Sequence, residues 1–179
     1  MTRSKRVLSL VLIVVLMVSM LAIPAFAASD VWVQRFQQFP TITTGTTNYG
    51  YVKALQTFLL AASDKTAALI REGGGVDGGY GAKTKDAVKL FQMEVFPNDS
   101  SQWDGATGSK TWGRIAAWLE VIQYSSTQFT FISFAQDVYR VTVNNGVYTY
   151  AYNSSDGWKT FRQVRYATLS VYKDVLKKK

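Results

Sequence analysis

The chain of 179 residues contains no cysteine, no histidine and only three prolines. Without cysteine or histidine there is no disulfide, no thiol nucleophile, no Ser–His or Cys–His catalytic pair and no ordinary zinc site. Most hydrolase mechanisms are therefore excluded, and we expect neither a metal nor another cofactor. Stability has to come from packed cores, for which 47% hydrophobic and 14% aromatic residues are sufficient.

The first 27 residues have the pattern of an export signal. Basic residues at positions 3, 5 and 6 precede the apolar run 7–23, which Pro24 ends. Ala25-Phe26-Ala27 then supplies the small side chains that a signal peptidase requires. We expect cleavage at this point, followed by secretion and no membrane attachment of residues 28–179. A retained membrane anchor is the alternative interpretation of the apolar run.

An eight-residue motif occurs twice in the middle of the chain. Residues 77–84 and 104–111 both have the pattern D-G-x-x-G-x-K-T, and each copy is followed by apolar residues at helical spacing. Each copy therefore predicts a glycine turn that leads into a helix. Thr84 and Thr111 are expected to cap these helices, and Asp77 and Asp104 to brace the turns.

A further helix is predicted after Asn48-Tyr49-Gly50, because apolar residues recur at intervals of three and four from Val52 to Ala62. Three short helices can bury enough surface only by packing on one another. The expected centre of that core consists of six residues: Leu55, Leu59, Val88, Phe91, Ile115 and Leu119.

Three ordered motifs carry a resemblance to a known family. They are residues 51–56, residues 77–84 with the following Ala87-Val88 and Phe91-Gln92, and residues 104–112. In this order they resemble the small three-helix, type 1 peptidoglycan-binding domain of bacterial cell-wall hydrolases, over residues 39–119. The resemblance implies a non-catalytic domain that holds a protein on the cell wall, with residues 28–38 as an N-terminal linker. The chain departs from the family at 64–72, which lengthens the first connection and predicts an extra helical turn.

The ligand-binding residues follow from the chemistry of peptidoglycan. The apolar faces of its sugars stack on flat rings, and its peptide carboxylates bind amides and cations. The candidates are two aromatic residues beside the loops, with three polar neighbours: Tyr80, Trp103, Lys83, Gln92 and Asp104. A structural role is the alternative for each of them, with Tyr80 facing the core and Asp104 bracing its loop.

Residues 121–176 predict a small antiparallel β-rich module, so the fold class is α+β. Strands are expected at 129–134, 138–143, 147–152, 158–164 and 166–172, with a tight hairpin turn at Asn145-Gly146. Residues 177–179 form a basic tail. Tyrosines and basic residues of this module are either a binding face or ordinary strand composition: Tyr148, Tyr150, Tyr152, Tyr166, Tyr172, Arg140, Lys159, Arg162 and Arg165.

Together these features predict a secreted, wall-associated protein that binds peptidoglycan and is not an enzyme. The formal net charge of +8 falls to +5 without the three basic residues of the signal, which suits anionic wall polymers as further partners. Export removes nucleic acid as a partner. One alternative is a regulator or inhibitor of a wall hydrolase, anchored by the helical domain. A glycan-cleaving enzyme that uses carboxylates such as Glu72, Glu94 or Glu120 is the least favoured hypothesis.

Overall fold

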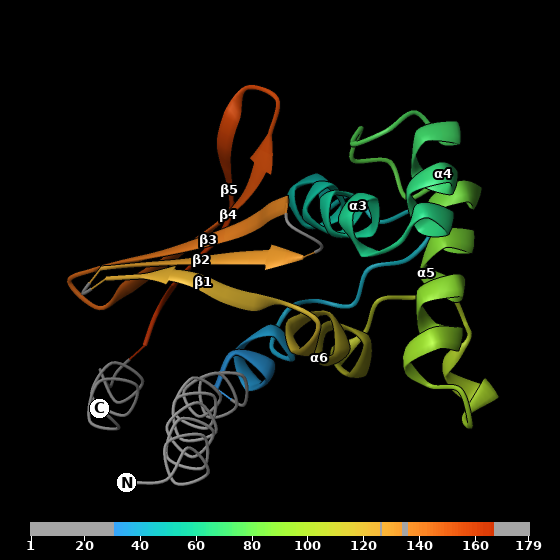
Figure 1. The fold of residues 1–179 in the computed structure, drawn as a ribbon, viewed down its shortest axis with the longest axis horizontal. Coiled ribbons are helices and arrows are strands. Elements are labelled where there is room, and N and C mark those ends of the chain that lie inside the picture. Colours follow the sequence, from blue (N-terminus) through green and yellow to red (C-terminus); the bar gives the residue numbers. More distant parts are fainter. Residues whose placement is uncertain (1–30, 126, 134–135, 167–179) are drawn as a thin grey trace, which may run out of the picture.

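The computed structural model describes residues 31–125, 127–133 and 136–166 (Figure 1). It contains helices followed by an antiparallel sheet, so the predicted α+β class is confirmed. The helical elements are α3 (Tyr49–Ala62), α4 (Asp64–Glu72), α5 (Ala82–Val95), the 3-10 turn η1 (Ser100–Gln102) and α6 (Ser109–Ala117). The strands are β1 (Glu120–Tyr124), β2 (Gln128–Ser133), β3 (Gln136–Asn144), β4 (Val147–Ser154) and β5 (Gly157–Arg165).

Helix α4 is the extra element that the long first connection predicts. It begins with a reciprocal capping box, in which the Thr66 amide donates to the Ser63 hydroxyl and the Ser63 amide donates to the Thr66 hydroxyl. It ends at three glycines, and Gly74 and Gly75 take the left-handed conformation. The segment is thus a complete nine-residue helix rather than a single added turn.

The predicted caps of α5 and α6 are wrong. Gly81 and Gly108 occupy the N-cap positions with extended backbone, and neither helix has a side-chain cap. Thr84 and Thr111 are the third residues of their helices and are buried. Their hydroxyls accept hydrogen bonds from buried glutamines, and this tertiary partner explains why threonine stands there.

The five strands form a meander in which each strand pairs with the next, in the order β1-β2-β3-β4-β5. The predicted hairpin at Asn145-Gly146 is confirmed, because both residues have positive φ and Asn144 pairs with Val147. Strand β1 was not predicted; it forms the edge of the sheet by pairing with β2. Of the predicted last strand, Tyr166 lies outside any strand and 167–172 lie outside the described residues, as do the signal 1–27 and the tail 177–179.

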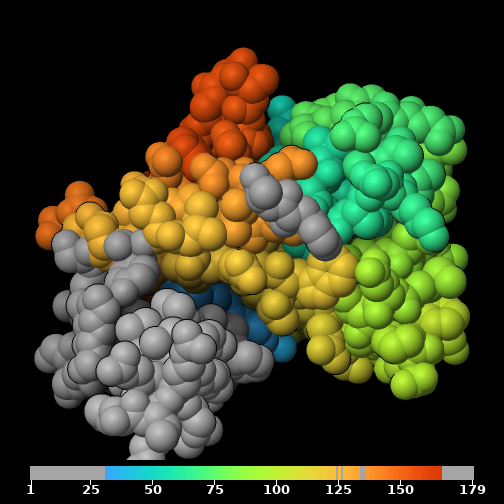
Figure 2. Space-filling model, viewed as in Figure 1, coloured from blue at the N-terminus to red at the C-terminus, as the bar shows by residue number. Residues whose placement is uncertain are grey.

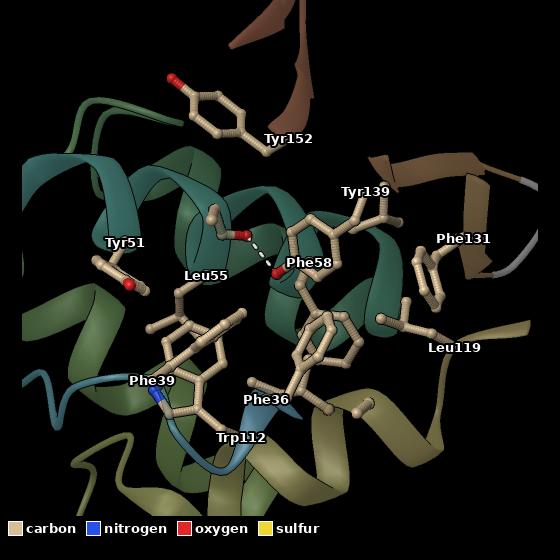
Figure 3. Close-up of a cluster of buried hydrophobic side chains, with 14 of the residues drawn as sticks. Phe36, Phe39, Tyr51, Leu55, Phe58, Trp112, Leu119, Phe131, Tyr139 and Tyr152 are labelled. Atoms are coloured by element: carbon tan, nitrogen blue, oxygen red, sulfur yellow. Dashed lines mark hydrogen bonds between the residues drawn. The ribbon is translucent and has the colours of Figure 1, made fainter. Parts of the chain in front are cut away.

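One face of the sheet packs on α3, which lies between the sheet and the helices α4 and α5 (Figure 1). The contact is an aromatic core in which the Tyr139 hydroxyl donates to the Ala54 carbonyl over 2.7 Å (Figure 3). Phe161 packs against Gly50 so closely that a Cβ there would lie 3.3 Å from the phenylalanine Cβ. All six residues predicted for the helical core are buried, but their cluster continues without a break into the sheet.

The predicted linker takes part in this core. Residues 31–36 are helical, and the side chains of Trp32 and Phe36 are buried against Phe129 and Phe131 of β2. Aromatic residues at this spacing fall on one face of a helix, so the segment has an apolar stripe to bury. The described part of 28–38 is therefore packed structure and not a free connection.

The tyrosines predicted as a possible binding face are mostly internal. Tyr148, Tyr150 and Tyr152 point into the core with exposed fractions of 1%, 1% and 6%. The alternative interpretation, ordinary strand composition, fits these three. The hairpin of β4 and β5 stands out from the surface beside α3 (Figure 2). Within the described ranges, no helix is long and apolar enough to cross a bilayer.

Candidate ligand-binding site

The first glycine loop is a rigid turn built around Asp77. One oxygen of its carboxylate, Oδ1, accepts a hydrogen bond from the Gly79 amide at 2.8 Å, which closes an Asx turn. Between them Gly78 has a φ of +86°, and a Cβ there would lie 3.0 Å from Cε of Lys53. Position 78 therefore requires glycine both for its backbone conformation and for the close approach of the loop to α3.

A buried glutamine of α3 holds this loop from beneath. The Gln56 amide nitrogen donates to Asp77 Oδ1 at 2.8 Å, to the Gly79 carbonyl at 3.1 Å and to the Thr84 hydroxyl at 3.2 Å. Its Oε1 accepts from the Gly78 amide at 2.9 Å. The hydrogen bond from Gln56 is the main reason why the pKa of the Asp77 carboxyl is lowered.

The second loop repeats this arrangement atom for atom. The Gln92 amide nitrogen donates to Asp104 Oδ1 at 2.9 Å, to the Ala106 carbonyl at 2.8 Å and to the Thr111 hydroxyl at 3.2 Å. Its Oε1 accepts from the Gly105 amide at 2.8 Å. We call these two assemblies the glutamine clasps, one centred on Gln56 and the other on Gln92.

The clasps show that the sequence repeat is longer than the glycine motif. Val52-Lys53-x-x-Gln56 precedes the first loop and Val88-Lys89-x-x-Gln92 precedes the second. The spacing from glutamine to aspartate is nine residues longer in the first copy, and nine is the length of α4. Sequence reasoning missed Gln56 as a partner of the loop; the shared V-K-x-x-Q pattern is the signal that would have found it.

Tyr80 joins the two clasps and is not on the surface. Its side chain is buried, and its hydroxyl donates to the Gly105 carbonyl of the second loop over 2.7 Å. Burial raises the pKa of Tyr80 to about 12, so the hydroxyl is a proton donor throughout the physiological range. Tyr80 therefore faces the core, as the alternative interpretation predicts, and is not at the surface to contact a ligand.

Gln92 is likewise internal, with an exposed fraction of 1% and both ends of its amide bonded to its own loop. Asp104 is exposed, although its Oδ1 also braces the loop through the Ala106 amide at 2.8 Å. The structure brings these two residues together, but only Asp104 lies at the surface.

Trp103 and Lys83 lie at the surface beside the two loops. The Trp103 ring is half-buried, and its Nε1 donates to the Phe96 carbonyl at 3.0 Å, which fixes the orientation of the ring. Lys83 is partly exposed and pairs with Glu72 at the end of α4. That pair raises the pKa of Lys83, mainly through the hydrogen bond that its ammonium group donates to Glu72. Of the five candidates, Lys83, Trp103 and Asp104 are thus accessible.

Comparison with known proteins finds no family model, no curated protein and no solved structure that matches this chain. The resemblance to a peptidoglycan-binding domain therefore rests on the motifs and on the duplicated geometry that the motifs produce.

The exposed side chains beside the two loops form one face of the molecule, and their groups suit the binding of a ligand. Among the described residues no cluster of three or more carboxylates could hold a metal ion. Every aspartate and glutamate of the described ranges is exposed. The face offers a fixed indole ring, an exposed carboxylate and several ammonium groups.

Proposed function

We propose that this protein binds the peptidoglycan of a bacterial cell wall outside the cell and is not an enzyme. The observation that supports this most is the pair of glutamine clasps, which hold two equivalent loops in one fixed arrangement. Preorganised loops lose little entropy when a ligand binds, which favours affinity. The export signal and the basic composition agree with this location.

In this proposal α3, α5 and α6 correspond to the three helices of the family that the motifs resemble. Helix α4 is then an insertion between the first helix and the first loop, and it leaves the hydrogen bonds of the Gln56 clasp equivalent to those of the Gln92 clasp. The insertion adds the Glu72–Lys83 ion pair beside the first loop. We therefore assign the main ligand contacts to the second loop, which has no such insertion.

The second loop offers the groups that this ligand class needs. The half-buried ring of Trp103 can stack on the apolar face of an acetylated sugar. Asp104 can accept hydrogen bonds from sugar hydroxyls or from the amides of a peptide stem, and Lys110 can pair with a stem carboxylate. Lys83 offers a second ammonium group near the first loop.

The exposure of the carboxylates supports the non-catalytic assignment. Cleavage of a glycosidic bond needs two carboxyl groups, one of which stays protonated because its surroundings raise its pKa. Glu72 is paired with Lys83, and Glu94 and Glu120 are exposed. We infer that the protein retains itself, or a partner, on the wall without cutting it.

The experiment is co-sedimentation of the whole protein with purified cell walls. The whole chain is needed because the core of residues 39–119 is continuous with the sheet. Trp103→Ala should weaken sedimentation by about tenfold, the loss expected for one stacked ring. Trp158→Ala is the matched control, because Trp158 is also half-buried but lies on β5, away from the loops.

If the unmutated protein stays in the supernatant, the proposed function is wrong. If Trp103→Ala sediments as well as the unmutated protein while Trp158→Ala does not, the binding face is wrongly assigned to the loops. Release of soluble fragments from the walls by purified protein would contradict the non-catalytic assignment.

A further inference from the structure

Arg35 is a buried cation held between two aromatic rings. Its exposed fraction is 8%, and its guanidinium carbon lies 4.7 Å from the centroid of Tyr148 and 3.5 Å from that of Tyr166. Its Nε is buried and has no hydrogen-bond partner in the described part of the chain. A buried arginine is normally paired with a carboxylate, because an uncompensated charge is costly away from water.

A second arginine, Arg162 of β5, lies in the same aromatic region. Its Nη1 donates to the Tyr51 hydroxyl at 2.9 Å and to the Gln38 carbonyl at 3.4 Å, and its guanidinium carbon lies 5.1 Å from the centroid of Phe39. Its Nε is also buried without a partner among the described residues. All of these contacts are with uncharged groups, so among the described residues this arginine too has no counter-charge.

Tyr166 links the surroundings of the two arginines: Arg35 stacks on its ring, and its hydroxyl lies beside Gln38, whose carbonyl accepts from Arg162. The hydroxyl of Tyr150 is a further polar group of this region. It lies 3.4 Å from the hydroxyl of Tyr166. Burial raises the pKa of Tyr150, so the phenol stays neutral and supplies no negative charge. Arg35 and Arg162, with the tyrosines 51, 148, 150 and 166, form what we call the arginine–tyrosine cluster.

The cluster reaches the surface at Gln38. This residue is exposed, and its Oε1 lies 3.5 Å from the Tyr166 hydroxyl while its carbonyl accepts from Arg162. Tyr166 and Arg162 are themselves only half-buried. An external group can therefore approach the Arg162 end of the cluster from this side.

We propose that the arginine–tyrosine cluster binds an anionic group with charged oxygens, the phosphate of a wall polymer in the first instance, which supplies the negative charge that neither Arg35 nor Arg162 has beside it among the described residues. Guanidinium groups bind phosphate and carboxylate oxygens through paired, charge-assisted hydrogen bonds. The rings of Tyr148 and Tyr166 position the guanidinium of Arg35 for that contact, and the ring of Phe39 lies against that of Arg162.

The site consists of residues of the sheet and its C-terminal end, the 31–38 segment and Tyr51 of α3, and it includes no residue of the glycine loops. The choice of a wall polymer rests on the location given in the proposed function, but binding of an anion at this cluster does not require binding of peptidoglycan.

The protein is purified in the form that its cells accumulate and is titrated with inorganic phosphate at constant ionic strength. The thermal midpoint of unfolding, Tm, is measured at each phosphate concentration. Phosphate should raise the Tm by about 3 °C or more over potassium chloride, since a ligand of the folded state stabilises it. Arg35→Gln and Arg162→Gln should each remove this shift. Arg140→Gln is the matched control and should keep it, because Arg140 also stacks on a ring, that of Trp158 at 4.1 Å, outside the cluster.

Two further arms identify the source of the oxygens. Acetate at the same ionic strength tests a carboxylate, and poly(glycerol phosphate) tests a phosphodiester chain. A shift with phosphate and the polymer but not with acetate supports a phosphate ligand, whereas an equal shift with acetate supports the site but assigns it to carboxylates. No shift beyond that of potassium chloride, or a shift that both cluster variants retain in full, would overturn the proposal.

A second measurement needs no variant and covers the case in which a substitution prevents folding. In NMR spectra of the unmutated protein, phosphate should move the Nε–Hε resonances of Arg35 and Arg162 in a saturable way. The Nε–Hε resonance of Arg140 should move little. Saturable movement confined to the two cluster arginines supports the site, and equal movement of all three arginines overturns it.

Discussion

Tyr139 of β3 donates its hydroxyl proton to the carbonyl oxygen of Ala54 in α3 over 2.7 Å, inside the core. Burial raises the pKa of this phenol well above its ordinary value, so it remains a donor. The bond crosses from the sheet to the helices and ties the unit that carries the glycine loops to the β-rich unit. The two predicted units therefore share one hydrophobic core.

Tyr139→Phe should lower the free energy of unfolding by about 1 kcal/mol, the usual net value of one buried hydrogen bond. Urea denaturation measures it. Tyr49→Phe is the control, because the Tyr49 ring is 61% exposed. Equal stability of the two variants would show that the bond does not contribute to holding the sheet on α3.

Removing either glutamine clasp should lower the free energy of unfolding by more than Tyr139→Phe does. Gln56→Leu leaves the Gly78 amide without its buried partner, and Gln92→Leu does the same to the Gly105 amide. Each should lower the free energy of unfolding by about 2 kcal/mol, since an unsatisfied buried donor loses its solvation without compensation. Gln123→Leu on the exposed edge strand is the control. A loss of less than about 0.5 kcal/mol for both clasp variants would contradict the described role of the clasps.

Comparing Gly105→Ala with Gly45→Ala should separate the loss of stability caused by steric overlap from the loss caused by backbone strain. Gly105 and Gly45 have similar left-handed φ values of +73° and +82°, but a Cβ at Gly105 would lie 2.6 Å from the Lys85 side chain, whereas a Cβ at Gly45 has open space. Gly45→Ala should therefore cost about 1 kcal/mol from strain alone. Gly105→Ala should cost clearly more in the same urea experiment. Equal losses would show that the second loop can move away from α5.

The Asp77 carboxyl predicts how acid affects the first loop. Its pKa is lower in the folded chain, mainly because Gln56 donates to it, so its contribution to stability is complete above the unfolded pKa of about 4. That contribution is lost as the pH falls through the folded pKa. Carbon-detected NMR titration of the carboxyl should show the pKa rising towards its ordinary value in Gln56→Leu. An unchanged pKa would mean that the bond from Gln56 is not its cause.

If residues 1–27 are an export signal, as the sequence predicts, the first residue of the processed protein follows. Protein recovered from the medium or from the wall fraction should begin at Ala28, which N-terminal sequencing or intact mass determines. Recovery of a chain that still begins with residues 1–27 from the membrane fraction alone would favour the retained anchor instead.

The parts of the fold that depend on local pattern were predictable from the sequence. The Asn145-Gly146 turn, the helices after both glycine motifs and the extra helix at 64–72 follow from turn chemistry and apolar spacing over a few residues. Strand β1 was missed because it depends on pairing with β2, and residues 31–36 were missed because their apolar stripe gains its role only against that strand.

The candidate site was harder to predict, for a related reason. Tyr80 and Gln92 have side chains that suit a ligand and also suit internal hydrogen bonds, and only the positions of their partners decide between the two. Those partners lie 25 residues away for Tyr80 and 12 to 19 residues away for Gln92. For Tyr80 no sequence pattern contains that information, whereas for Gln92 the repeated V-K-x-x-Q pattern indicates a role shared with Gln56.

The most direct test of the account is NMR mapping of backbone amides during titration of the whole protein with soluble peptidoglycan fragments. The account predicts saturable shifts at residues 103–110 and smaller shifts at 77–83, with the amides of β2 and β3 unchanged. The complete absence of saturable shifts, or shifts confined to the sheet, would contradict the claim that the clasped loops bind the wall.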